Sequence, residues 1–119
     1  MAGTVVTSER IHGSAKKVIF AWTSAASGAA DATTVAAFDG RIVGLITIPG
    51  TPAPTTLYDV AVLDGDGHDV LLGAGADRSA AVTEYKTEAN LAAVAASKLT
   101  LAVTNAGDAK QGTVILFIR

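Results

Sequence analysis

The sequence contains no cysteine among its 119 residues. This excludes a disulfide framework, a thiolate metal site and a cysteine nucleophile. Aromatic residues are few, at 5%, and charged residues make up only 17%, below the roughly one quarter that is usual in soluble domains. Few charges leave much apolar surface on a small monomer, so we expect a large area of contact with other molecules.

Long hydrophobic runs are absent as well. Mean hydropathy is high, at +0.41, but no apolar run approaches the ~20 residues that a membrane helix needs. Residues 1–10 include Glu9 and Arg10 and lack the pattern of a secretory signal. The net charge is −2 and the basic residues are scattered among the acids, which argues against a nucleic-acid partner. We therefore predict no membrane and no nucleic acid among the partners, and we expect the basic side chains on solvated strand edges.

Small and β-forming residues fill the chain instead, with 24 Ala, 14 Thr, 12 Val and 12 Gly. They form short β-like runs separated by turn residues, which is the spacing of a sandwich or a small barrel. The length suits one domain. We predict an all-β fold, a compact antiparallel β-sandwich or small β-barrel, with residues 1–12 as an N-terminal strand or extended arm and 13–119 as a single β-domain.

Alternating apolar residues locate the strands, because every second side chain of a strand points to the same face. The expected strands cover residues 4–11, 16–23, 38–48, 57–63, 70–72, 99–104 and 113–118. We expect 57–63 to pair with 70–72, and 99–104 to form a closing hairpin with 113–118. The predicted core consists of Val18, Phe20, Trp22, Ile42, Val60, Val62, Leu101, Val103, Leu116 and Ile118.

Three stretches do not follow this alternation. Residues 24–34 have no clear period and are predicted as an exposed loop. All three prolines fall within residues 49–54, where the chain should cross over rather than pair. Residues 77–97 fit a helix, because of their alanine content, or an extended segment. We favour extended structure there because the flanking elements are β.

The best metal candidates are Asp64, Asp66 and Asp69, since hard cations bind several oxygen ligands. The helix–loop–helix calcium pattern needs Gly at its sixth and Glu at its twelfth position, and here Asp69 and Gly75 stand there. Turn chemistry explains the segment without a metal, because Asp side chains bond their own backbone. We predict no metal and no cofactor.

No set of residues indicates catalysis. The two histidines, His12 and His68, have no helical i+3 or i+4 ligand partner, and an exposed turn histidine is commoner than a catalytic base. Serines 14, 24 and 79 show no nucleophile-elbow spacing. The glycine-rich residues 73–76 lack the lysine and hydroxyl of a phosphate loop. We predict that the protein is not an enzyme and has no catalytic residues.

Contacts with other chains are expected through apolar positions that one buried face does not explain. The run 38–48 is apolar on both faces, so either it is central or one face meets another subunit. The N-terminal segment could add to a neighbouring sheet edge. The candidate contact residues are Val5, Val6, Ile11, Val43 and Leu45. Trp22 and Tyr58 could stack on a sugar, but a lone Trp on the most apolar strand is more often core.

The order of the β-runs resembles a known group of proteins. The segments that carry the resemblance are residues 17–24, 38–42, 58–60, 66–71, 75–78, 99–107 and 112–119. In this order they resemble the small β-rich virion proteins encoded among the head genes of tailed bacteriophages, and in particular capsid decoration, or cement, proteins. The resemblance covers about residues 16–119, and its motifs are structural.

The resemblance implies a virion structural protein that binds the outer surface of the capsid and stabilises the head. The implied partners are the major capsid protein and further copies of this chain, because such proteins are often trimers or dimers. Of these homo-oligomers we favour the trimer. The implied location is the capsid surface of the virion, and the host cytoplasm during assembly. The alternatives are a head–tail joining or tail structural protein, and a non-enzymatic sugar- or surface-binding β-module.

Overall fold

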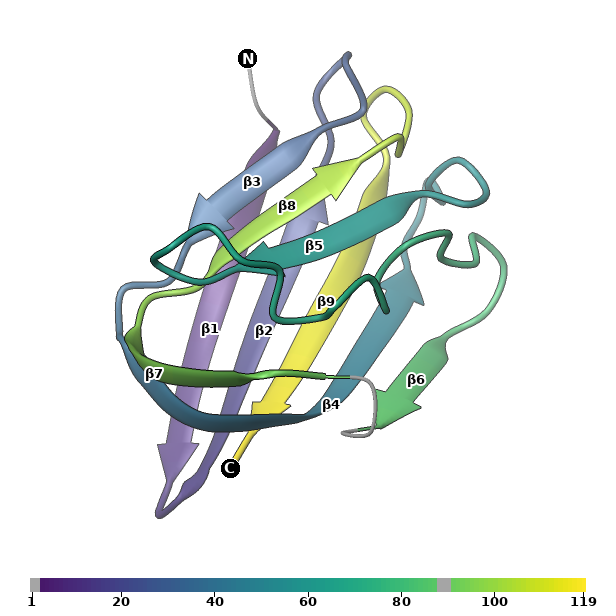
Figure 1. The fold of residues 1–119 in the computed structure, drawn as a ribbon. Coiled ribbons are helices and arrows are strands. Elements are labelled where there is room, and N and C mark those ends of the chain that lie inside the picture. Colours follow the sequence, from purple (N-terminus) through teal and green to yellow (C-terminus); the bar gives the residue numbers. More distant parts are fainter. Residues whose placement is uncertain (1–2, 88–90) are drawn as a thin grey trace.

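The computed structural model describes residues 3–87 and 91–119, and over these ranges the chain is all-β (Figure 1). The strands are β1 (Thr4–His12), β2 (Ala15–Thr23), β3 (Ala30–Thr33), β4 (Phe38–Pro49), β5 (Asp59–Leu63), β6 (Glu84–Thr87), β7 (Ala93–Ser97), β8 (Thr100–Thr104) and β9 (Gln111–Ile118). All strand pairs are antiparallel. In the described ranges no helix is long and apolar enough to cross a membrane.

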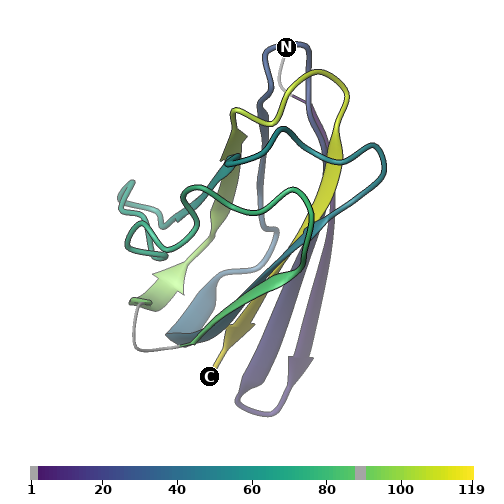
Figure 2. The same cartoon turned by 90° about the vertical axis from the view of Figure 1, so that its right-hand side faces the viewer.

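The strands form two sheets that pack face to face, which confirms the predicted β-sandwich (Figure 2). The large sheet has the order β1-β2-β9-β4-β6, and β7 pairs with the first part of β4. The small sheet has the order β3-β8-β5. Strand β4 is long and curved, so that its first residues pair with β7 and its later residues with β6. A register shift between Ile42 and Gly44 marks the bend, as expected for a β-bulge.

The core lies between the two sheets and contains every residue that the alternation placed there. The ten predicted core side chains are at most 3% exposed. Further large side chains of the core are Phe38, Leu45, Tyr58, Leu71 and Leu99. Burial of this apolar surface is the main force that holds the sheets together.

Two predicted strand pairings are wrong. Strands β8 and β9 do not form a hairpin, because β8 lies in the small sheet and β9 lies in the large sheet between β2 and β4. Residues 70–72 form turns rather than a strand, and a single bridge joins Leu63 to Asp69. Alternation shows which side chains of a strand share a face. It does not show which strand is the neighbour, because the backbone amides and carbonyls of a strand can form hydrogen bonds with many other strands. The partner is chosen by the packing of the whole sandwich.

Three other segments can now be placed. The expected loop 24–34 contains β3, which the mixed small residues concealed. The 49–54 segment does cross over, from β4 in the large sheet to β5 in the small one. Within 77–97, the described residues include the extended strands β6 and β7 and no helix, whereas residues 88–90 lie outside the described part of the chain.

The N-terminal segment is strand β1, which pairs with β2 along its whole length, from Thr4 opposite Thr23 to His12 opposite Ala15. It is therefore part of the large sheet and not a separate arm. Gly3, just before β1, is bound to the segment that leads into β3, because its amide donates to the carbonyl of Ala29 at 3.1 Å. Val5 packs against the core.

Candidate functional sites

The turn after β5 brings together Asp64, Asp66 and His68, whose potential ligand atoms all lie within 4.8 Å of one another. The Oδ1 atom of Asp64 already accepts the amides of Asp66 and His68, both at 3.0 Å. The hydrogen bond from the His68 amide is the main cause that lowers the pKa of Asp64. The carboxylate thus stabilises the turn, as the turn chemistry of the sequence predicts.

Asp69, the third metal candidate, is not part of that group. Its carboxylate accepts three backbone amides, from Val62 at 3.3 Å, Leu71 at 3.0 Å and Gly73 at 3.0 Å. These bonds fasten the turns of residues 70–75 to β5. The side chain is a structural acceptor whose oxygens are occupied by the protein itself.

The serines and glycines considered for catalysis also have structural partners. The Ser24 hydroxyl lies 2.5 Å from the carbonyl of Gly107 and 2.9 Å from the amide of Lys110. The Ser79 hydroxyl accepts two amides of the following turn, and Ser14 is exposed in the β1–β2 turn. At Gly75 an added Cβ would lie 2.1 Å from the carbonyl oxygen of Val60, so this glycine permits close backbone packing and not phosphate binding.

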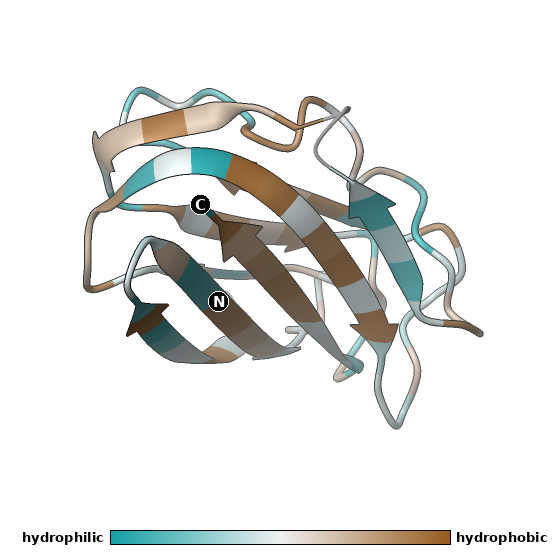
Figure 3. Ribbon diagram, turned by 90° about the horizontal axis from the view of Figure 1, so that it is seen from below, coloured by the Kyte–Doolittle hydropathy of each residue, from teal (hydrophilic) through white to brown (hydrophobic). Residues whose placement is uncertain are grey.

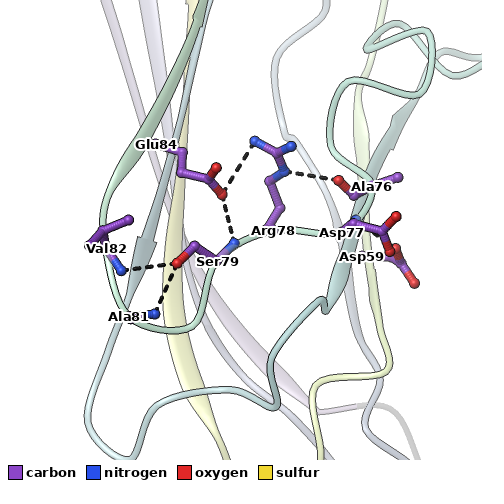
Figure 4. Close-up of polar contacts among 8 residues, drawn as sticks. All are labelled: Asp59, Ala76, Asp77, Arg78, Ser79, Ala81, Val82 and Glu84. Carbon is purple, nitrogen blue, oxygen red and sulfur yellow. Dashed lines mark hydrogen bonds and ion pairs between the residues drawn. The ribbon is translucent and has the colours of Figure 1, made fainter.

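Arg78 is buried, although we expected all basic side chains in solvent (Figure 4). Its Nε donates to the carbonyl of Ala76 at 3.1 Å, and its Nη1 lies 3.5 Å from Oε1 of Glu84 on β6. The same Glu84 oxygen accepts the amide of Ser79 at 2.6 Å. The ion pair joins residues 76–79 to the large sheet. No local pattern could reveal it, because Glu84 reaches Arg78 only after the loop folds back.

Trp22 and Tyr58 do not form a surface for sugar stacking. Both are buried, and their ring centroids lie 5.6 Å apart at 50° inside the core. Burial raises the pKa of Tyr58, because the phenolate would lose its contact with water. The two residues contribute to packing.

The side of the large sheet that points away from the small sheet, which we call the outer face, carries apolar side chains that are partly exposed. One row of cross-strand neighbours runs over all five strands: Ser8, Ile19, Ile115, Ile46 and Tyr85. The adjacent row toward the top of Figure 1 contains Val6, Ala21, Thr113 and Ile48. Hydrophobic residues along β4 and β9 are visible in Figure 3.

Of the five expected contact residues, two are accessible. Val6 is 71% exposed on the outer face, and Ile11 is 63% exposed near the β1–β2 turn. Leu45 is in the core, at 1% exposure, and is therefore unavailable to a partner. Val5 packs against the core, and Val43 is half-buried at the β4 bulge.

An aromatic pair lies on the outer face where β4 carries a glycine. A Cβ at Gly44 would lie 2.7 Å from the Tyr85 hydroxyl and 3.1 Å from Cδ2 of Phe117. The Tyr85 hydroxyl and the edge of the Phe117 ring thus both lie over Gly44. The Nζ of Lys17 lies 6.0 Å from the centroid of the Phe117 ring. Lys17 is on β2, the neighbour of β9 on the side opposite to β4. Sequence reasoning missed this group because its residues come from four strands.

Two hollows are found at opposite ends of the large sheet. One, of about 460 Å³, is lined by the β1–β2 turn region and Phe117. Its lining residues are Arg10, Ile11, His12, Ala15, Lys16, Lys17 and Phe117. The other, of about 580 Å³, is lined by Gly3, Thr4 and residues 23–27, none of which is ionisable. Only the first combines charge with apolar surface.

No protein family and no curated protein matches the sequence. Among solved structures, a xylan-binding module, CBM86, from Roseburia intestinalis is 10% identical, with 99% of this chain and 89% of that chain covered and a TM-score of 0.42. An exo-β-1,3-galactanase from Phanerochaete chrysosporium is 11% identical, with 98% and 29% covered and a TM-score of 0.42. A chain in the structure of infectious bursal disease virus, Gx strain, is 12% identical to this chain. The match covers 98% of this chain and 32% of the viral chain, with a TM-score of 0.38.

Proposed function

We propose that this chain is a non-enzymatic structural protein of a phage virion, which binds the outer capsid surface and stabilises the head. The observation that carries the proposal is the uncovered outer face, where Ile19, Ile115, Ile46 and Ile48 lie on the three neighbouring strands β2, β9 and β4. Side chains of this kind on a regular sheet provide a broad and rigid contact area. The resemblance of the sequence to decoration proteins supplies the identity of the partner.

The proposal includes self-association, most simply as a trimer, in addition to binding of the major capsid protein. Many identical weak contacts across a symmetric shell give strong net attachment through multivalency. The low fraction of charged residues, 17%, keeps the desolvation cost of such contacts small.

Copy number in purified virions that carry this gene tests the proposal. A decoration protein should be present at on the order of hundreds of copies and label the capsid lattice in cryo-electron microscopy. A head–tail joining protein should be present at roughly a dozen copies at one vertex. Absence from the particle would contradict both virion roles.

A second candidate function is glycan binding, which the Tyr85–Phe117 pair over Gly44 favours. Exposed aromatic rings offer flat apolar surface to a ligand, and such rings are common in binding sites. Tyr85 is 57% exposed. Affinity electrophoresis on soluble polysaccharides should then show retardation that Tyr85→Ala removes and Val35→Ala, at an exposed loop position, leaves intact. No retardation on any polysaccharide of the panel would reject this candidate.

A further inference from the structure

We propose that the outer face is a docking surface for an acidic segment of a protein partner that also presents apolar side chains. The inference concerns the chemistry of the partner. It uses the same face as the proposed function, but it does not require that the partner be a capsid protein.

The first observation is that, among the described residues, three adjacent rows of the outer face contain no acid, although the chain has 11 acids and a net charge of −2. The rows are Arg10, Lys17, Phe117, Gly44 and Thr87; Ser8, Ile19, Ile115, Ile46 and Tyr85; and Val6, Ala21, Thr113 and Ile48. The acids in the strands of the large sheet are Glu9, Asp39 and Glu84. Each one binds backbone amides instead. Glu9 accepts those of Val35 and Ala36, Asp39 accepts that of Ala96, and Glu84 accepts that of Ser79.

The second observation is that the fold collects cations at one end of this sheet. Arg10 lies opposite Lys17, and Lys17 lies opposite Phe117. Arg119 follows Ile118, the partner of Lys16, and exchanges two backbone hydrogen bonds with Arg41 at 3.0 and 2.9 Å. Five of the nine basic residues therefore lie at the end that holds the β1–β2 turn and the C-terminus (Figure 1). In the sequence they are dispersed.

The third observation is that this arrangement has an energetic cost. Arg10 and Lys17 are directly opposite each other in the β1–β2 pair, and like charges at such positions are destabilising. An anion bound between them would relieve the repulsion. The hollow of about 460 Å³ lies at this place and is lined by both side chains, with Phe117 as its apolar wall.

Together, these features select the partner class. A carboxylate would be held between Arg10 and Lys17, while neighbouring apolar side chains would pack on Phe117 and on the isoleucines of the next row. A nucleic acid or an anionic membrane would meet the cations, but its phosphates would leave that apolar row uncovered. Alternating acidic and apolar side chains match both zones.

The test uses the full chain and two fluorescent synthetic peptides of equal charge, one alternating glutamate with leucine and one alternating glutamate with serine. We expect the glutamate–leucine peptide to bind more tightly in fluorescence anisotropy. Binding should weaken between about 0.15 and 1 M salt, because screening acts on the charged part of the contact. Equal binding of both peptides would overturn the apolar part of the proposal.

Lys17→Glu separates binding from folding. It should weaken peptide binding at least about tenfold, and its Tm should not fall, because the new carboxylate would face Arg10. The matched control is Lys110→Glu. Lys110 lies just before β9, and its backbone bonds Ser24, which follows β2 at the end away from Lys17. This control should bind the peptide like the unaltered protein. Unchanged binding by Lys17→Glu would reject the surface.

Ile19→Thr tests the apolar part of the outer face. We expect it to weaken binding of the glutamate–leucine peptide and to leave binding of the glutamate–serine peptide unchanged. A single-stranded oligonucleotide and phosphatidylserine vesicles complete the comparison. Tighter binding of either one than of the glutamate–leucine peptide would overturn the assignment to a protein partner. Peptide binding by a protein that is absent from virions would uphold this inference and reject the proposed function.

Discussion

Phe20 lies in the middle of β2 and is completely buried between the two sheets. Phe20→Ala removes most of a large apolar side chain and leaves a cavity, so we expect the free energy of unfolding to fall by about 3–5 kcal/mol. Urea denaturation followed by tryptophan fluorescence measures this, because Trp22 is buried in the same strand. Ala21→Ser, at an exposed position of β2, is the control. A loss below about 1 kcal/mol would contradict close packing at this position.

Glu84 compensates the buried charge of Arg78, and its side chain is 32% exposed while that of Arg78 is 8% exposed. Glu84→Gln leaves the guanidinium without its carboxylate, and we expect a loss of about 1.5–3 kcal/mol. Replacing both residues, as in Arg78→Met with Glu84→Gln, should recover part of that loss, because no uncompensated charge then stays buried. Chemical denaturation of Glu84→Gln, of Arg78→Met and of the double variant provides the comparison. Additive losses would show that the two side chains do not interact.

Asp59 links stability to pH. Its Oδ1 accepts the amide of Asp77 at 2.9 Å and its Oδ2 accepts the side-chain amide of Asn105 at 2.6 Å. The hydrogen bond from Asp77 is the main cause that holds the pKa of Asp59 below its ordinary value of 3.8. Since the folded pKa is the lower one, this contribution to stability is present above pH 3.8 and is lost as the pH falls through the folded pKa.

Asp59→Asn should therefore reduce the drop in Tm between pH 7 and pH 3. Differential scanning calorimetry at both pH values measures the drop, and Asp108→Asn, at an exposed loop position, is the control that should retain it. An equal drop in the protein with and without Asp59→Asn would contradict this role.

At the scale of elements, the carboxylate of Asp69 holds the turns that follow β5 in place. Asp69→Ala removes the acceptor of three backbone amides, so we expect a loss of about 2–3 kcal/mol. Asp66→Ala, in the neighbouring turn, should change stability little, because its side chain is exposed. Thermal denaturation of both variants provides the measurement. Similar losses in the two variants would contradict this distinction.

The same connection should not depend on a metal. We expect the Tm to be unchanged by millimolar calcium and by a chelator, because Oδ1 of Asp64 and both carboxylate oxygens of Asp69 already accept backbone amides. A Tm that rises by several degrees with calcium and falls with the chelator would show that the turn binds the ion.

At the scale of the whole molecule, β1 closes one edge of the large sheet. Deletion of residues 1–12 would unpair the edge of β2 and uncover the side of the core where Val5 packs. An unpaired edge strand invites association with other chains. We therefore expect a lower Tm and aggregation, measured by calorimetry and light scattering. Val6→Thr, which changes only an exposed side chain of β1, should retain the native behaviour. A stable, soluble truncated protein would favour a detachable arm.

Local alternation determined much of this protein. The period of two in residues 16–23, 99–104 and 113–118 is a property of each segment alone, since burial selects apolar side chains at every second position. It sufficed to predict the all-β class and the ten core residues. The turn role of Asp64 followed from a different local property, the tendency of Asp side chains to bond their own backbone. The proline segment likewise predicted its crossover, because proline limits its own backbone and that of its predecessor.

Only the tertiary structure decided which strands are neighbours and which distant side chains meet. β9 lies between β2 and β4 rather than beside β8, because strand pairing is set by the packing of all strands together. The same packing buries Arg78 against Glu84 and places Arg10 opposite Lys17. No local sequence pattern links the residues of these pairs. Their contacts form only when the sheets have assembled, so they could not be predicted from the sequence.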